Sequence, residues 1–579
     1  MKPPPRRAAL LARPLILGLL ARAIGAAPAW CQPASTGVPA PSFPVPIEQP
    51  RPPLPVQPAP SPLRGAPQPL PPSQPAAPPA APTMVVRRFL FTGNTVFSTA
   101  RLERLSAAYL DRPLNFAELG QLRDAITQLY VSSGYSTSGA YIPMQTSDDG
   151  VVEIRILEGR LAEVNVDAKG RLRPFYIRSR LLRAGGGVLN IPRLLHELQL
   201  LQANPLIKTI TANLAPSPDP GMSVLQVKAV SNRSFQIAAA MDNGRNPQTG
   251  SFRRGVDLSE ANLTGYGDRL AAIYRNSDGS NDLQLSYQTP LGNSDLALTA
   301  SYRDLHSWIV EKPLNILNIH SHYRQWFVGL RQPIIRRLTE ELALGLNLNK
   351  QDNQGLFLQG LPFPGRGVDP NGESRVTTLS FSQDWTQRSN IDVLALRSEF
   401  AMGLQGWDST TPYDFGIDPN SPDPGFLLWR ADGQYLRQLA RDTVLVVRSR
   451  VQVANDPLPS VEQFGLGGLG SVEGYQTNSL LTDSGVFGSL EVALPLLRSK
   501  QSQQLLQLVP FAAIGYGWNA GPAQPETNLL YSVGIGMQLR LGEQFYGRVD
   551  YAQRLGPTPY LISNATQDQA ILFTVRYAP

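Results

Sequence analysis

Residues 462–496, EQFGLGGLGSVEGYQTNSLLTDSGVFGSLEVALPL, decide how the rest of the chain is interpreted. The first half is rich in glycine and has few strand formers, whereas residues 486–496 have the composition of a β-strand. Long loops without regular structure are uncommon in compact domains and are usually functional. Alternating, strand-like segments flank this loop on both sides, so we expect it to belong to a large sheet or barrel.

From Ser234 onward, large apolar residues alternate with small or charged ones, as in residues 342–348, 394–404 and 531–541. This alternation predicts the lipid-facing and lumen-facing sides of a transmembrane β-barrel. A soluble sandwich also alternates, but its strands are usually about half as long as these segments. About sixteen antiparallel strands can be counted between 232 and 579. Short turns alternate with long connections, which we expect at 304–317, 352–372, 406–425, 455–483 and 554–567.

The first 83 residues are typical of an exported protein. Basic residues precede a short apolar run and the small-residue site Ala27-Pro28-Ala29, so residues 1–29 are predicted to be a signal peptide. Residues 30–83 are predicted to be a disordered linker, because 20 prolines lie between 32 and 83. A partner-binding proline tract is the alternative for the same segment. No later stretch is long and apolar enough for a membrane-spanning helix.

Charge and composition argue against several classes of function. Residues 1–83 contain seven Lys and Arg and one Glu, which accounts for +6 of the formal charge of +7. The remainder is near neutral, so no nucleic-acid partner is expected. The glycines of 465–470 lack the strand and helix of a dinucleotide site, and no cofactor is predicted. His320 and His322 share a strand face without acidic or Cys company, so no metal site is predicted.

Residues 84–231 contain one small α/β pattern twice. In the first copy, helices are predicted at 99–110 and 116–133, followed by a hairpin around Asp149-Gly150. In the second copy, helices are predicted at 174–183 and 191–202, followed by another hairpin. We therefore predict two domains, at 84–160 and at 161–231.

The segments FTGNTVFS, ITQLYVSSGYSTSGAYIP and VVEIRILEGRLAEV resemble a POTRA domain of two-partner secretion transporters. The loop FGLGGLGSVEGYQTNSLLTDSGVFGSLEVALPL resembles the barrel motif of the ShlB/FhaC/HecB family of hemolysin secretion/activation proteins. The resemblance covers about 84–577. It implies two periplasmic POTRA domains on a sixteen-stranded outer-membrane barrel. Such a protein would have no enzymatic activity and would export one large partner exoprotein, unfolded and without ATP.

The sequence departs from the family at the tip of the loop, where the family reads Val-Arg-Gly-Tyr and this chain has Glu473 for the arginine. The family's partner aspartate is replaced by Gly515. Arg548 shares a predicted lumen face with an acidic and an aromatic residue, so we expect it to pair with Glu473. The alternative is a solvated Glu473. The lumen-loop motif comprises Gly467, Gly470, Val472, Glu473, Gly474 and Tyr475.

The resemblance also suggests where the exported client binds. Extended segments can add to exposed sheet edges, and we expect such edges at 152–157 and 224–230. Further partners expected are outer-membrane lipid and the barrel assembly machinery. A general barrel assembly insertase or a passive porin are the alternative functions. The residues predicted to bind the client are Val152, Ile154, Ile156, Val224, Gln226 and Lys228.

Overall fold

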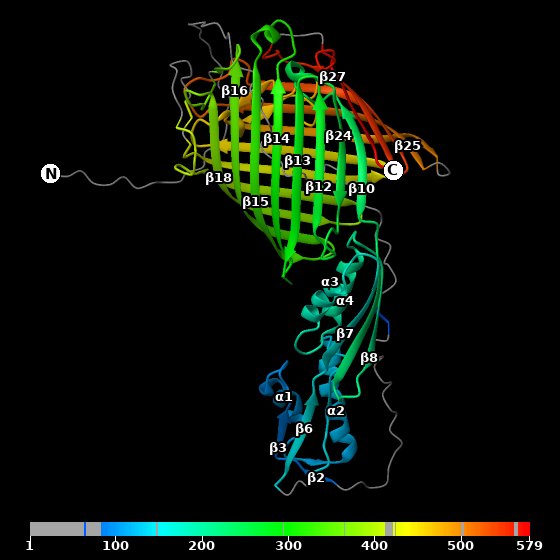
Figure 1. Cartoon of the computed structure of the whole chain (residues 1–579). Coiled ribbons are helices and arrows are strands. Elements are labelled where there is room, and N and C mark those ends of the chain that lie inside the picture. Colours follow the sequence, from blue (N-terminus) through cyan, green and yellow to red (C-terminus); the bar gives the residue numbers. More distant parts are fainter. Residues whose placement is uncertain are drawn as a thin grey trace, which may run out of the picture.

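The computed structural model describes residues 63–64, 83–145, 149–292, 294–363, 365–411, 421–422, 424–499, 503–560 and 565–579. The predicted signal peptide and most of the predicted linker lie outside these residues. The described chain forms two small α/β modules, one below the other, under a closed β-barrel (Figure 1). None of the described helices has the length and apolar character needed to cross a membrane.

The first module packs two helices on a three-stranded sheet in the order β3-β6-β5. Asn115 and Glu118 form a capping box at the start of α2, which fixes where that helix begins. Apolar residues of α2 and β6, including Ile126 and Ile154, are fully buried against each other. The elements are β2 (Met84–Val85), β3 (Arg88–Thr92), α1 (Thr99–Ser106), a 3₁₀ turn (Ala107–Tyr109), β4 (Pro113–Leu114), α2 (Phe116–Ser132), β5 (Gly139–Tyr141) and β6 (Val151–Leu157).

The second module repeats this plan with the strand order β1-β8-β9-β7. Leucines of both helices, such as Leu181 and Leu198, are buried against Leu225 and Val227 of the sheet. The outermost strand, β1, comes from the proline-rich segment and pairs in parallel with β8. The elements are β1 (Leu63–Arg64), β7 (Arg160–Lys169), α3 (Pro174–Ala184), α4 (Ile191–Gln202), β8 (Ile207–Pro216) and β9 (Met222–Ser231).

The barrel wall has sixteen antiparallel strands, as predicted. It closes where β10 pairs with β28 over four residue pairs, whereas every other junction of the wall has at least seven. We call the β10–β28 junction the seam. The strands of the wall are β10 (Phe235–Asp242), β11 (Arg253–Glu260), β12 (Arg269–Ser277), β13 (Ser280–Leu291), β14 (Leu296–Trp308), β15 (His320–Arg336), β16 (Glu340–Phe357), β18 (Glu373–Arg388), β19 (Asp392–Gly403), β20 (Leu427–Ala440), β21 (Thr443–Ala454), β24 (Ser484–Ser499), β25 (Gln504–Trp518), β26 (Leu529–Leu541), β27 (Phe545–Arg554) and β28 (Ile571–Tyr577).

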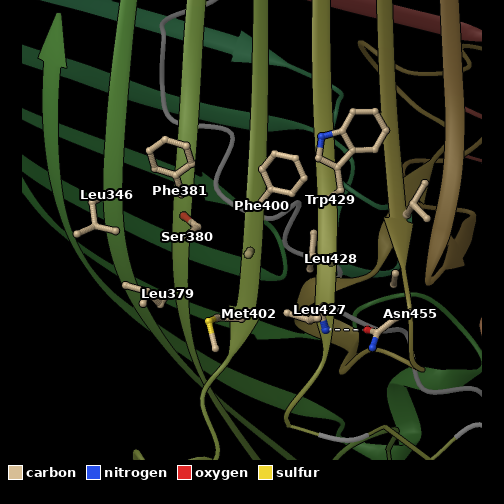
Figure 2. A pocket seen from close by; sticks show the side chains of 13 residues that line it. Leu346, Leu379, Ser380, Phe381, Phe400, Met402, Leu427, Leu428, Trp429 and Asn455 are labelled. Carbon is tan, nitrogen blue, oxygen red and sulfur yellow. Dashed lines mark hydrogen bonds between the residues drawn. The ribbon is translucent and has the colours of Figure 1, made fainter. Parts of the chain in front are cut away.

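The two faces of the wall differ as the alternation predicts. On β27, Arg548 and Asp550 are buried inside the barrel, whereas Val549 and Tyr551 are about half exposed on the outside. Figure 2 shows Phe381, Phe400 and Trp429 side by side on the outer face of β18, β19 and β20. A water-exposed surface of such apolar side chains would be unfavourable, and contact with lipid removes that cost.

Two strands continue further outward than predicted. β14 extends to Trp308 and β16 to Phe357, so the connections expected to begin at 304 and 352 begin later. Polar side chains in these extensions do not end a strand, because the backbone ladder with the neighbouring strand continues beyond the apolar band. A short strand, β17 (Leu361–Pro362), lies in the connection after β16.

Candidate functional site: the loop in the barrel lumen

The connection at 455–483 folds into the barrel interior and packs on its wall. A short hairpin of β22 (Phe464–Leu466) and β23 (Leu480–Thr482) forms its stem. The stem and the tip of the loop form one buried apolar cluster with the inner faces of β24, β25 and β26. Its members are Phe464, Leu466, Val472, Tyr475, Leu480, Phe487, Ala513 and Leu530. Apolar burial is therefore a main source of the loop's attachment.

Two glycines allow the loop and the wall to approach each other. A Cβ atom on Gly515 would lie 2.7 Å from Leu466 Cδ2 and 3.0 Å from Val472 Cγ2. The acid that the family has at this position would therefore displace the loop. In the tip, Gly474 has φ +94°, and a Cβ atom there would lie 2.6 Å from the Ala552 carbonyl oxygen.

The charged residues of the loop tip and wall form a compact cluster. Arg548 donates hydrogen bonds to Glu491 and Asp550, each at 2.8 Å, and Arg448 also pairs with Glu491. Glu473 lies buried in the electrostatic neighbourhood of Arg548. Its Oε1 accepts a long hydrogen bond of 3.5 Å from the Gly470 amide. Among the residues that the structure describes, its Oε2 and the Arg548 Nη2 have no hydrogen-bond partner.

The direct Glu473–Arg548 ion pair expected from the sequence is therefore not formed. Arg548 is held instead by two acids of the wall, one of them on its own strand. The alternative expectation of a solvated Glu473 is also wrong, because only 7% of this residue is exposed. The sequence correctly placed Arg548 and Asp550 on one lumen face but could not show which acid the arginine would contact.

Sequence reasoning missed the ion pairs at both ends of the loop. Glu462 pairs with Arg430 of β20. Asp483, which is fully buried, accepts hydrogen bonds from Arg366 at 2.9 Å and from the Leu458 amide at 3.0 Å. Arg366 belongs to the outer connection after β16, more than a hundred residues away in sequence. The only sign of these ion pairs in the sequence was one acidic residue on each side of the glycine-rich stretch, Glu462 before it and Asp483 after it.

Beyond Tyr475 the loop reaches both sides of the seam. On the β10 side, the Thr477 hydroxyl donates to the Gly244 carbonyl, and the Asn246 amide donates to the Thr477 carbonyl, both at 3.0 Å. On the β28 side, the Thr477 backbone amide donates to Gln567 at 3.0 Å, and Gln476 donates to Asp568 at 3.0 Å. The loop is thus bonded to the segments that follow the first strand and precede the last.

The two segments predicted to be exposed sheet edges are central strands, so that part of the prediction is wrong. β6 lies between β3 and β5, so Val152, Ile154 and Ile156 belong to a central strand and are buried in the first module's core. β9 lies between β8 and β7, so the backbone at Val224, Gln226 and Lys228 is already paired on both sides. A continuous apolar alternation marks a central strand at least as well as an edge strand. The outer strands are β3 and β5 in one module, and β7 and β8, with β1 on β8, in the other.

The second module is fixed to the barrel through an ion-pair hub, which we define as Asp295, Arg180, Arg183, Arg336 and Glu197. Asp295, in the turn after β13, pairs with Arg180 at 3.1 Å, Arg183 at 2.8 Å and Arg336 at 2.9 Å. Burial acts to raise the pKa of Asp295, but the three arginines outweigh it and hold the pKa below its usual value. Burial raises the pKa of Glu197, and the arginines offset this only in part.

Comparison with known proteins shows which family the chain belongs to. Residues 221–539 match the family described as haemolysin secretion/activation protein ShlB/FhaC/HecB, and residues 84–159 match the ShlB-type POTRA domain. The first match covers more than half of the chain. The chain belongs to the ShlB/FhaC/HecB family. It is an outer-membrane transporter of the two-partner secretion type, and its family consists of transporters and not enzymes.

Relatives of this transporter are similar to it over about two thirds of their length or more. The outer membrane transporter CdiB of Dickeya dadantii is 21% identical over 403 residues, covering 68% of this chain and 69% of the relative. The heme/hemopexin transporter protein HuxB of Haemophilus influenzae (strain 86-028NP) is 21% identical over 513 residues, covering 84% and 86%. The structure of CdiB from Escherichia coli has a TM-score of 0.63 at 21% identity, covering 87% of this chain and 92% of that chain.

A structure of BamA from Haemophilus ducreyi lacking POTRA domains 1–3 also resembles the transporter, with a TM-score of 0.51 at 13% identity. It covers 86% of this chain and 100% of that chain. At this identity the likeness shows a shared fold and carries no functional argument.

Proposed function

We propose that this transporter exports one large exoprotein, which it recognises through its POTRA domains and passes unfolded through the barrel lumen without ATP. The observation that carries this proposal is the loop, which is attached to the lumen wall by apolar packing, hydrogen bonds and ion pairs. Contacts of this kind can be exchanged for contacts with a passing chain. Folding of the exoprotein outside the cell would supply the free energy, and the POTRA domains would face the periplasm.

The strand that receives the client is, in this proposal, β8. An edge strand presents unpaired backbone groups that an extended peptide can bond, whatever its side chains. The outer edge of β8 already accepts an extended segment in parallel, because Leu63 and Arg64 pair with Ala212 and Asn213. The chain's own linker segment thus occupies the edge that a client strand would use, and the client would have to displace it.

Site-specific photo-crosslinking tests this assignment. A photoreactive residue at Asn213, exposed beside the β8 edge, should capture the exoprotein during secretion. The matched control is Asp167, exposed on β7 at the opposite edge of the same sheet. Deleting residues 61–66 should increase the Asn213 adduct, because the competing segment is removed. Capture at Asp167 but not at Asn213 would contradict β8 as the receiving strand.

Deletion of residues 84–231 tests the transport function itself. The protein to monitor is a large exoprotein whose appearance outside the cell depends on the intact transporter. The deletion should abolish its appearance outside the cell, while the purified barrel still inserts into planar bilayers and conducts ions.

The rival functions give different results for the same deletion. A passive porin would lose no client. A barrel assembly insertase would instead show reduced amounts of unrelated outer-membrane barrels. A normal level of secreted exoprotein after the deletion would refute recognition by the POTRA domains.

A further inference from the structure

Three side chains that commonly bind metal ions meet on the outer surface of β14 and β15. They are Asp304, His306 and His322. Leu305 and Ser307, which alternate with the first two, are buried on the lumen side, so Asp304 and His306 face outward. His306 lies directly opposite His322 in the register of the two strands. A rigid strand pair therefore holds all three side chains on one face.

The cluster lies on the outer-loop side of the membrane interface. Tyr302 and Trp326 form an aromatic pair with ring centroids 5.7 Å apart, two residues further toward the membrane. Aromatic girdles of this kind mark the interface in transmembrane barrels. About half of the His306 side chain is exposed, so an ion from the medium can reach the cluster without local unfolding.

The atoms that would bind an ion already converge. His306 Nε2 lies 3.1 Å from Asp304 Oδ1, and His322 Nε2 lies 2.9 Å from Asp304 Oδ2. The two imidazole rings are stacked with centroids 3.9 Å apart, and the three ligand atoms lie within 4.8 Å of one another. Tetrahedral zinc sites with bonds of about 2.1 Å separate their ligand atoms by about 3.4 Å. Small side-chain rotations would therefore bring these atoms onto one ion.

The surroundings favour a cation at this place. The Tyr302 hydroxyl donates to Asp304 Oδ2 at 3.1 Å and so orients the carboxylate, as outer-shell partners do in metal sites. Arg324 lies across from Asp304 in the register but turns away from it. Its guanidinium lies over the Trp326 ring at 5.7 Å and pairs with Asp352 at 3.9 Å. The cluster thus has one carboxylate and two imidazoles.

We propose that Asp304, His306 and His322 bind a zinc-type divalent ion, with water in the fourth position. The ion would link β14 to β15 at the base of the outer connection 309–319. From the sequence, only His320 and His322 were considered as possible metal ligands, because they lie two residues apart on one strand. His320 is not a ligand in this proposal, because it does not belong to the group of described residues whose ligand atoms converge.

The small number of histidines makes a sharp test possible, since the chain has four and one cysteine. The full chain, purified in detergent with an affinity tag free of histidine, is stripped with a chelator. It is then titrated with Zn²⁺ against a chromophoric chelator near pH 7.5. We expect one ion per chain. His306→Ala, His322→Ala and Asp304→Asn should each weaken binding about tenfold or more, whereas His320→Ala and His196→Ala should leave it unchanged.

Two further measurements keep the test decisive. The shift of each variant between heated and unheated gel samples shows whether its barrel is folded, so that misfolding is not mistaken for loss of a ligand. The visible absorption spectrum of bound Co²⁺ should report tetrahedral coordination in the unmodified protein and in His320→Ala. Absence of stoichiometric binding, or an equal loss in His320→Ala and His306→Ala, would overturn the proposal.

Discussion

Gly515 carries the main difference between this loop and the family motif. The loop's Leu466 and Val472 occupy the space that an acid at position 515 would need. The replacement of the family's arginine and aspartate by Glu473 and Gly515 is therefore accompanied, at the tip of the loop, by apolar contact in place of a charge pair, while the two ends of the loop keep ion pairs through Glu462 and Asp483.

Gly515→Asp should displace the loop and not restore a family-like attachment. The added side chain would overpack the contact with Leu466 and bury a carboxylate, at a cost of about 1–3 kcal/mol or more. The expected result is a larger single-channel conductance in planar bilayers and faster proteolysis of the loop. Gly515→Ala should change both in the same direction by less. An unchanged conductance in Gly515→Asp would show that the loop does not depend on this contact.

Arg548→Ala should destabilise the lumen cluster strongly. It leaves Glu491 without one of its two arginines and Asp550 without its own, beside a third acid at Glu473. Removal of one partner from a buried pair costs roughly 3–5 kcal/mol. The temperature at which the barrel unfolds on heated gels should fall. Arg540→Ala, a lumen arginine on the adjacent β26, is the matched control and should have a smaller effect.

At the scale of elements, Asp295 is the centre of the ion pairs that attach the second module to the barrel. Asp295→Asn removes the negative charge shared by three arginines, two of them partly exposed, so we expect a loss of roughly 1–3 kcal/mol. Spin labels on α4 and on the turn between β18 and β19 should show a broader distance distribution. Asp219→Asn, in an exposed turn of the same domain, should leave the distribution unchanged.

The same hub predicts how domain attachment responds to pH. The pKa of Asp295 is lowered in the folded protein. Its contribution to the stability of the attachment is therefore complete above the pKa of about 3.9 in the unfolded chain, and is lost as pH falls through the lower pKa in the folded protein. The pKa of Glu197 is raised, so Glu197 favours the attached state most when it is protonated. The attachment should therefore persist at pH 5, loosen in stronger acid as Asp295 becomes protonated, and weaken slightly as pH rises through the raised pKa of Glu197. Loosening between pH 8 and 6 in the same spin-label measurement would contradict this assignment.

The elements themselves were largely predictable from the sequence. α4 (Ile191–Gln202) agrees with the prediction, and α2 (Phe116–Ser132) differs from it by one residue, because helical periodicity is a local signal. The order of strands in each sheet is not local, which is why two central strands were mistaken for edges. For the same reason, the Asp304–His306–His322 cluster was missed, since it joins residues of adjacent strands on either side of an outer connection.

At the scale of the whole molecule, the loop fills part of the lumen, so we expect it to limit the conductance of the barrel. Deleting residues 467–477 removes the tip while keeping β22 and β23, so the barrel should assemble and conduct more current in planar bilayers. Deleting residues 522–526, in the connection after β25, is a control that leaves the lumen contacts of the tip in place. Equal conductance in the two variants would show that the tip does not obstruct the lumen.

The barrel and its sixteen strands could be predicted because, along each strand, residues that face lipid alternate with residues that face the lumen. The position of the loop was implied by the resemblance, but its attachment was not. Its partners, such as Arg366, Gly244 and Gln567, come from three distant parts of the chain. No local pattern connects them, and only the closed wall brings them together.

From the hydrogen bonds of Thr477 with Gly244, Asn246 and Gln567 we predict an order of events during biogenesis. The loop is synthesised roughly a hundred residues before its last acceptor, and these acceptors become neighbours only when the two terminal strands of the wall meet. Contacts between such distant segments form late. We therefore expect the tip of the loop to bind the wall only after the barrel has closed. In a barrel whose terminal strands have not yet paired, the loop should remain sensitive to protease.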